Sequence, residues 1–147
     1  MLNLAYLKAI KILYSKLSDS GIERYITGKT NLSLQGIEIK PSHLWILIHD
    51  TDLDKFCKLF SNYEKSEIIE LENGEAKEFV MKIDDVDVMV CAEYSHGTYW
   101  VVMKNPISIL IENMKIPCFS LESDRDAYIR LGMLGKAEII NNHLKKQ

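Results

Sequence analysis

The sequence lacks the features that mark fibrous, disordered or strongly charged proteins. Its 147 residues hold only 3 prolines and 7 glycines, and 47% of them are hydrophobic, which excludes collagen-like and disordered chains. No charge of one sign dominates, because 18 Lys and Arg stand against 21 Asp and Glu, for a formal net charge of -3. This balance argues against a protein built mainly to hold duplex DNA or an anionic membrane.

Cysteine is also scarce, and long hydrophobic runs are missing. Cys57, Cys91 and Cys118 are scattered and lack the spacing of a metal site, so we expect free thiols in a reducing compartment. The longest apolar run, residues 44–48, is far shorter than the ~18 residues of a membrane-spanning helix. The N-terminal segment shows no small-residue cleavage site of a signal peptide. We therefore expect a cytoplasmic protein without a membrane segment.

Hydrophobic periodicity predicts a helix at each end of the chain and strands between them. Apolar residues recur at helical spacing over residues 2–17 and again over residues 123–145. The nearly continuous apolar run at residues 43–48 is typical of a central strand that is covered on both faces. Further strands are predicted at residues 22–27, 76–83, 86–94, 107–111 and 116–121. This mixture predicts a single α+β domain over residues 1–147, with a mixed sheet flanked by helices.

A glycine turn follows the first predicted strand. Gly28-Lys29-Thr30 looks like the end of a phosphate-binding P-loop, but the leading glycine of that motif would stand at position 23, which is Glu23. A true P-loop is therefore excluded. The turn indicates a function only in combination with the strand predicted at residues 43–48, which begins shortly after it.

Taken together, the segments at residues 27–36 and 41–48 resemble the nucleotidyltransferase superfamily, in particular its small bacterial and archaeal, minimal or antitoxin-type members. The pattern of that family is a Gly-Ser or Gly-Gly turn, then Asp-hydrophobic-Asp on the next strand, and a third carboxylate on a later strand. The segments at residues 116–122 and 127–137 resemble the closing strand and helix of the same group. The resemblance implies a nucleotidyltransferase-like α+β fold over most of the chain.

The chemistry of the family explains which residues this site needs. Side chains two residues apart on a strand point the same way, so the two aspartates lie side by side. With the third carboxylate they hold two divalent ions, which activate the attacking oxygen and stabilise the leaving phosphate. The glycine turn lets backbone N–H groups approach the phosphates of the nucleotide.

This sequence departs from that pattern at the residues that bind metal. The two aspartate positions are His43 and Trp45, and the serine of the turn is Lys29. An indole binds no metal, and an imidazole favours zinc or copper over magnesium. Only Asp87, on the strand at residues 86–94, matches the third carboxylate. The resemblance therefore implies a degenerate site at His43, Trp45 and Asp87, without metal ligands or assigned catalytic residues, and a nucleotide contact at Gly28 and Lys29.

These observations predict a catalytically inactive nucleotidyltransferase-like protein that binds a nucleotide or a protein partner and needs no cofactor. One alternative is an active enzyme that moves a nucleoside monophosphate onto an acceptor with Mg²⁺ and a rearranged set of acids. The nearby candidates for such a set, which we interpret as turn carboxylates, are Asp50, Asp52, Asp54, Asp84 and Asp85. A second alternative is a structural or regulatory dimer, or one component of a toxin–antitoxin-like pair. None of these hypotheses involves a membrane or a nucleic acid.

Overall fold

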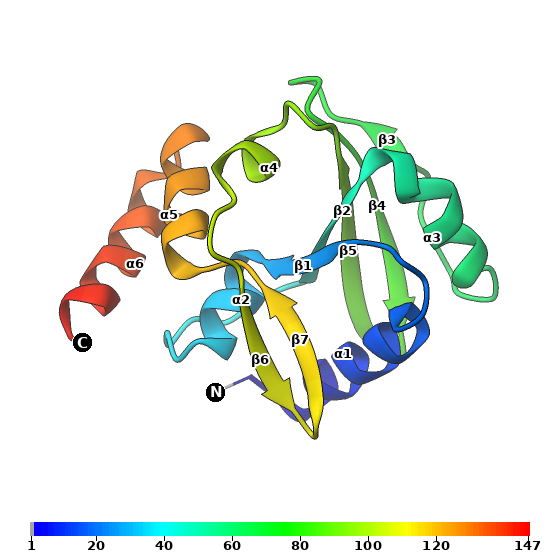
Figure 1. The fold of residues 1–147 in the computed structure, drawn as a ribbon, viewed down its shortest axis with the longest axis horizontal. Coiled ribbons are helices and arrows are strands. Elements are labelled where there is room, and N and C mark those ends of the chain that lie inside the picture. Colours follow the sequence, from blue (N-terminus) through cyan, green and yellow to red (C-terminus); the bar gives the residue numbers. More distant parts are fainter. Residues whose placement is uncertain (1) are drawn as a thin grey trace.

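The computed structural model describes residues 2–147 (Figure 1), in which helices and strands interleave. In chain order the elements are α1 (Leu4–Leu17), β1 (Arg24–Thr27), α2 (Gly28–Leu34), β2 (Leu44–His49), the 3-10 helix η1 (Asp50–Asp52), α3 (Leu53–Leu59), β3 (Ile69–Glu70), β4 (Ala76–Ile83), β5 (Val86–Glu93), α4 (Thr98–Val102), β6 (Ile107–Ile111), β7 (Met114–Cys118), α5 (Leu121–Arg130) and α6 (Leu134–Lys145). None of the helices in this described part is long and apolar enough to cross a membrane.

The strands form one mixed sheet of seven, in the order β3-β4-β5-β2-β1-β7-β6. β2 runs antiparallel to β1 and parallel to β5. This confirms that the segments predicted at residues 22–27 and 43–48 are neighbours, with the segment at residues 86–94 beside the latter. The fold is therefore α+β, with a mixed sheet flanked by helices.

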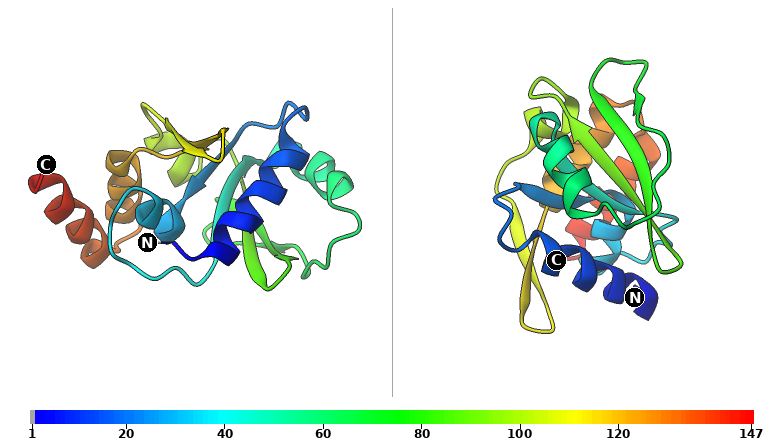
Figure 2. Two further views of the ribbon diagram at one scale, coloured as in Figure 1. Left: turned by 90° about the horizontal axis from the view of Figure 1, so that it is seen from below. Right: turned by 90° about the vertical axis from the view of Figure 1, so that its right-hand side faces the viewer.

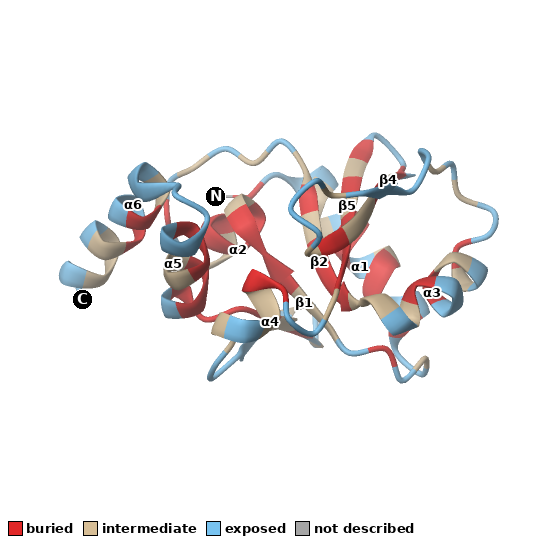
Figure 3. Ribbon diagram, turned by 90° about the horizontal axis from the view of Figure 1, so that it is seen from above, coloured by how far each residue is buried: buried red, intermediate tan, exposed pale blue. Residues whose placement is uncertain are grey.

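β2 lies in the middle of the sheet because its side chains are apolar on both faces. On the core face, which carries Leu44 and Ile46 of β2 and Val88 and Val90 of β5, the sheet packs against α1 and α3. We call the opposite side, which carries Trp45 and its neighbours, the cavity face. Figure 3 shows that buried residues follow the inner sides of α1, β2 and β5.

The prediction of a single C-terminal helix at residues 123–145 is wrong in one respect, because the structure has two helices there. Ser120 caps α5, its hydroxyl accepting a hydrogen bond from the N–H of Ser123, so the helix begins before the predicted start. α5 ends at Arg130, and Gly132 follows two residues later with a left-handed φ of 76°. The N–H of Met133 then donates to the carbonyl of Tyr128 at 2.8 Å, which closes a Schellman motif. α6 starts afresh beyond it.

The N-terminal helix predicted at residues 2–17 starts slightly later than expected. Asn3 is its N-cap, and the Asn3 side chain accepts a hydrogen bond from the N–H of Tyr6 at 3.1 Å. From Leu4 the helix runs to Leu17 with its apolar stripe on the core face of the sheet.

Candidate functional site

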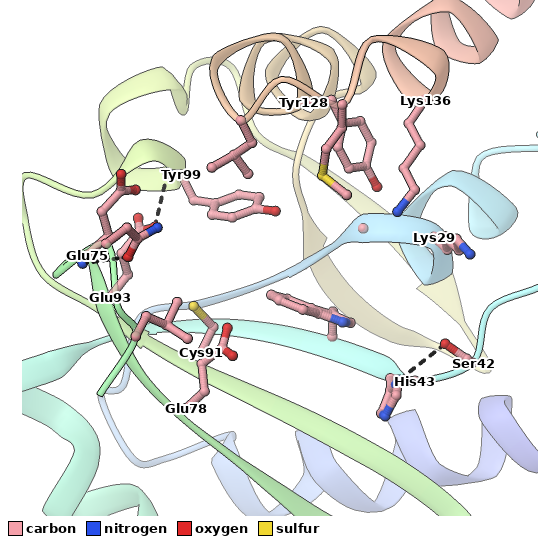
Figure 4. A pocket seen from close by; sticks show the side chains of 16 residues that line it. Lys29, Ser42, His43, Glu75, Glu78, Cys91, Glu93, Tyr99, Tyr128 and Lys136 are labelled. Carbon is pink, nitrogen blue, oxygen red and sulfur yellow. Dashed lines mark hydrogen bonds between the residues drawn. The ribbon is translucent and has the colours of Figure 1, made fainter. Parts of the chain in front are cut away.

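The cavity face of the sheet is hollowed between β2, β4 and β5 on one side and α4, α5 and α6 on the other (Figure 4). The cavity has a volume of about 270 Å³. Its walls are largely apolar and aromatic, with Trp45 on the sheet and Tyr99 and Tyr128 on the helices. Charged side chains gather at its two ends, with lysines at one and carboxylates at the other.

The glycine turn at the lysine end of the cavity has a left-handed conformation and is held in place by α5. Gly28 has a φ of 74°, a left-handed value that favours glycine. The buried carboxylate of Asp124 on α5 accepts hydrogen bonds from the hydroxyl of Thr27 and the amide of Asn31. Burial raises the pKa of Asp124 to about 6, against the lowering effect of these donors. The network fixes the turn between β1 and α2 in place.

Two half-buried lysines line the same end of the cavity (Figure 4). Lys29 follows the glycine turn, and Lys136 comes from α6, where its ammonium lies 5.5 Å from the centre of the Tyr128 ring. Burial lowers the pKa of Lys136, and so does the neighbouring charge of Lys29. Neither lysine forms an ion pair within residues 2–147. This end of the cavity therefore carries positive charge that no protein group balances.

The opposite end carries glutamates that the sequence did not single out. The carboxylate of Glu93 accepts hydrogen bonds from the N–H groups of Tyr99 at 3.2 Å and Trp100 at 2.8 Å, and Glu75 accepts one from the N–H of Thr98 at 2.8 Å. Burial raises the pKa of Glu93 to about 7. The pKa of Glu78 is also raised by burial. Glu75 and Glu93 therefore anchor α4 to the sheet.

Gly97 is the residue that lets Glu93 reach the start of α4. A Cβ at position 97 would lie 2.2 Å from Cγ and 2.3 Å from Cδ of Glu93, and that side chain is almost fully buried. We expect Gly97→Ala to displace Glu93 and to cost about 1–3 kcal/mol of unfolding free energy, as overpacking does. Urea unfolding checks this, with Gly135→Ala as control, because an alanine there meets open space at a backbone conformation without a left-handed φ. A Gly97→Ala protein as stable as the parent would show that the space beside Glu93 admits a Cβ, against this prediction.

The structure brings four of the five predicted site residues together at this cavity. Gly28, Lys29, His43 and Trp45 all line it. Asp87 is not among the residues that line it, and its part in the site stays a prediction. By alternation Asp87 lies on the cavity face with Cys91, near the start of β5, where its carboxylate forms an ion pair with Lys82 of β4 at 3.1 Å.

The side chains at the cavity do not suit the pair of divalent ions that the nucleotidyltransferase pattern implies. By the resemblance, His43 and Trp45 stand where that pattern has two aspartates, and the carboxylate of Asp87 forms an ion pair with Lys82. Both oxygens of Glu93 already accept backbone hydrogen bonds. Throughout residues 2–147, no three His, Cys, Asp or Glu side chains gather in a way that could hold a metal ion. Magnesium prefers several oxygen ligands, which this set does not offer.

Comparisons with known proteins identify the fold. Neither a protein-family model nor a curated protein sequence matches the chain. Among solved structures, it is similar to a presumed nucleotidyltransferase from Thermotoga maritima, with a TM-score of 0.76 and 20% identity over 100% of this chain and 97% of that one. It is also similar to the antibiotic-resistance factor ANT(2'')-Ia, with a TM-score of 0.58 and 13% identity over 99% of this chain and 94% of that one. A second structure of that factor, in complex with adenylyl-2''-tobramycin, gives a TM-score of 0.56 and 12% identity over 97% of this chain and 98% of the other. The fold of this chain is therefore that of a nucleotidyltransferase.

Proposed function

We propose that this protein binds a nucleotide in the cavity on its sheet and does not transfer it. The observation that carries the proposal is the pair of half-buried lysines, Lys29 and Lys136, which converge on the cavity beside the turn at Gly28 with no carboxylate to balance them. Two such cations form a favourable site for the phosphates of a nucleotide.

The rest of the cavity supports the same ligand and gives it one orientation. The aromatic walls, with Trp45 and Tyr99 at a ring separation of 6.4 Å, suit the flat face of a base. The carboxylates at the other end repel phosphate and accept hydrogen bonds from the sugar or the base. The similar structure that holds an adenylylated aminoglycoside supports the view that this fold accommodates a nucleotide moiety.

Nucleotide binding without metal is the test. Calorimetric titration in EDTA with the common nucleoside mono- and triphosphates is expected to give binding in the ~10 µM to ~1 mM range for at least one of them. Lys29→Ala and Lys136→Ala should each weaken this binding about tenfold, because each removes one charged contact to phosphate. Lys8→Ala, on the exposed side of α1, should leave it unchanged.

The other outcomes separate the competing functions. Binding that appears only with magnesium would favour the alternative of an active transferase with a rearranged set of acids. No binding of any nucleotide would overturn the proposal and favour a protein partner or a structural role.

A further inference from the structure

The sheet ends in two very different edge strands. β3 forms one edge, and it is two residues long and carries Glu70. β6 forms the other edge, with five residues in the order Ile-Ser-Ile-Leu-Ile, none of them charged and none of them proline. Natural proteins protect an exposed sheet edge by shortening it or by placing charges or proline on it. β3 is protected in this way, and β6 is not.

The outer edge of β6 is accessible. The β6–β7 hairpin projects from the body of the molecule (Figure 2). Its turn, between Ile111 and Met114, has two residues with positive φ, 46° and 67°, as in a type I′ turn. Such a turn makes Ile111 and Met114 a hydrogen-bonded pair, and pairing alternates along the strand. The backbone N–H and C=O groups of Ser108 and Leu110 therefore point away from β7, and no other strand among residues 2–147 pairs with them.

The side chains of β6 are also poorly covered. Leu110 is 65% exposed and Ile107 is 38% exposed. Ile109 and Ile111 pack against the main core but remain partly open at its margin. A β-strand that is apolar, uncharged and open on its outer side is suited to pairing with another strand.

We propose that β6 pairs with β6 of a second copy of this chain. The two strands run antiparallel about a two-fold axis at Ile109, so that Ser108 of each copy exchanges hydrogen bonds with Leu110 of the other. Ile107 of each copy then lies opposite Ile111 of the other. The partly exposed side chains of Ile109 and Ile111 of the two copies come together. The two sheets become one continuous sheet.

Self-complementarity is the reason to choose a second copy as the occupant. A two-fold interface sets each residue against its counterpart in the reverse order, and the sequence of β6 puts no charge opposite another. At the ends of the strand the charges are complementary. Glu112 follows β6 and Lys104 precedes it, both more than half exposed, and the antiparallel arrangement brings the glutamate end of each copy to the lysine end of the other. Within one copy Glu112 pairs with Lys11 and Lys104 pairs with Asp126, and such exposed ion pairs are weak enough to exchange partners.

The interface is small, so the dimer is weak. Five residues a side is well below the roughly 20–30 residues a side of a standard stable interface. We therefore expect dimerisation at high concentration, with a dissociation constant in the ~10 µM to ~1 mM range. This inference stands apart from nucleotide binding, because the hairpin contributes nothing to the lining of the cavity.

Sedimentation velocity over a concentration series, with hydrogen exchange at each concentration, tests the proposal. The dimer fraction should rise with concentration, and exchange at the amides of Ser108 and Leu110 should slow in parallel. Leu110→Lys should raise the dissociation constant at least about tenfold, since it sets two lysines on the same face across the axis. Ser108→Pro, which removes an outward N–H, should act in the same direction.

The other edge of the sheet provides the matched control. Ile69 on β3 is 54% exposed, and Ile69→Lys should change the dissociation constant less than about twofold. Circular dichroism confirms that each variant is folded. A protein that stays monomeric up to about 1 mM would overturn the proposal. A dimer that neither Leu110→Lys nor Ser108→Pro weakens would also overturn it, because the contact would then lie elsewhere.

Discussion

Incubated with magnesium and a labelled nucleoside triphosphate, the protein will form no labelled product above the level of a heat-inactivated sample. Water and the small-molecule and macromolecular fractions of a lysate serve as acceptors. The reason is electrostatic. Two divalent ions beside a polyanionic nucleotide need clustered carboxylates, and His43 and Trp45 supply none. Loss of a hydrogen-bond partner of a metal ligand alone costs about 10–100-fold, so the absence of two ligands should cost more.

Restoring the acids tests the same argument in reverse. The double variant His43→Asp/Trp45→Asp should bind nucleotide at least about tenfold more tightly with magnesium than with EDTA. The control His43→Asn/Trp45→Asn has the same shape without the charge and should show no such dependence. Both variants lose the half-buried indole, which costs up to about 3–5 kcal/mol, so their folding is checked first. Transfer by the unaltered protein that Glu78→Gln or Asp87→Asn abolishes would contradict the prediction.

The arrangement of the central strands could be predicted from the sequence because its signals are local. The apolar run at residues 43–48 requires cover on both faces, and this requirement alone places β2 inside the sheet. Period-two alternation in residues 86–94 gives the faces of β5. The resemblance to nucleotidyltransferases, and not these two signals, predicted that His43 and Trp45 share a site with Gly28 and Lys29, and all four line the cavity.

Side-chain contacts between residues far apart in the chain could not be predicted from the sequence. Asp87 has the predicted face, but its carboxylate is bound by Lys82, and that pair depends on the register of β4 against β5. Asp124 looks like an ordinary acid in the first turn of a solvated helix. In the fold it is buried, and Thr27 and Asn31, far away in the chain, donate hydrogen bonds to its carboxylate.

The break between α5 and α6 was missed for a local reason. Gly132 interrupts an otherwise helical pattern, and a single glycine is tolerated within a helix at a cost of about 1 kcal/mol. Apolar residues continue at helical spacing on both sides of it, so periodicity alone favours one long helix. What ends α5 is the bond from the N–H of Met133 to the carbonyl of Tyr128, which needs the left-handed φ of Gly132.

The protein should become more stable as the pH falls from 8 to 5, opposite to the trend that paired surface acids produce. Burial raises the pKa of Glu93 to about 7 and that of Asp124 to about 6, both above their values in the unfolded chain. The folded state then holds a proton that the unfolded state has released, so acid favours folding. Each contribution is complete at low pH and is lost as the pH rises through the folded-state pKa.

Shifts of this size correspond to on the order of 3 kcal/mol for each group. Glu23, Glu75 and Glu112 have lowered pKa values, but their contributions change only below the ordinary pKa of a glutamate, outside this window. Urea unfolding at pH 5, 6, 7 and 8 measures the slope. Glu93→Gln should remove roughly half of it, because a glutamine does not ionise, and most of the loss should fall between pH 5 and 7, below the folded-state pKa. Glu112→Gln, which removes an exposed carboxylate, should leave the slope unchanged. An unfolding free energy that rises from pH 5 to pH 8 in the parent would show that Glu93 and Asp124 ionise as freely in the folded protein as in the unfolded chain.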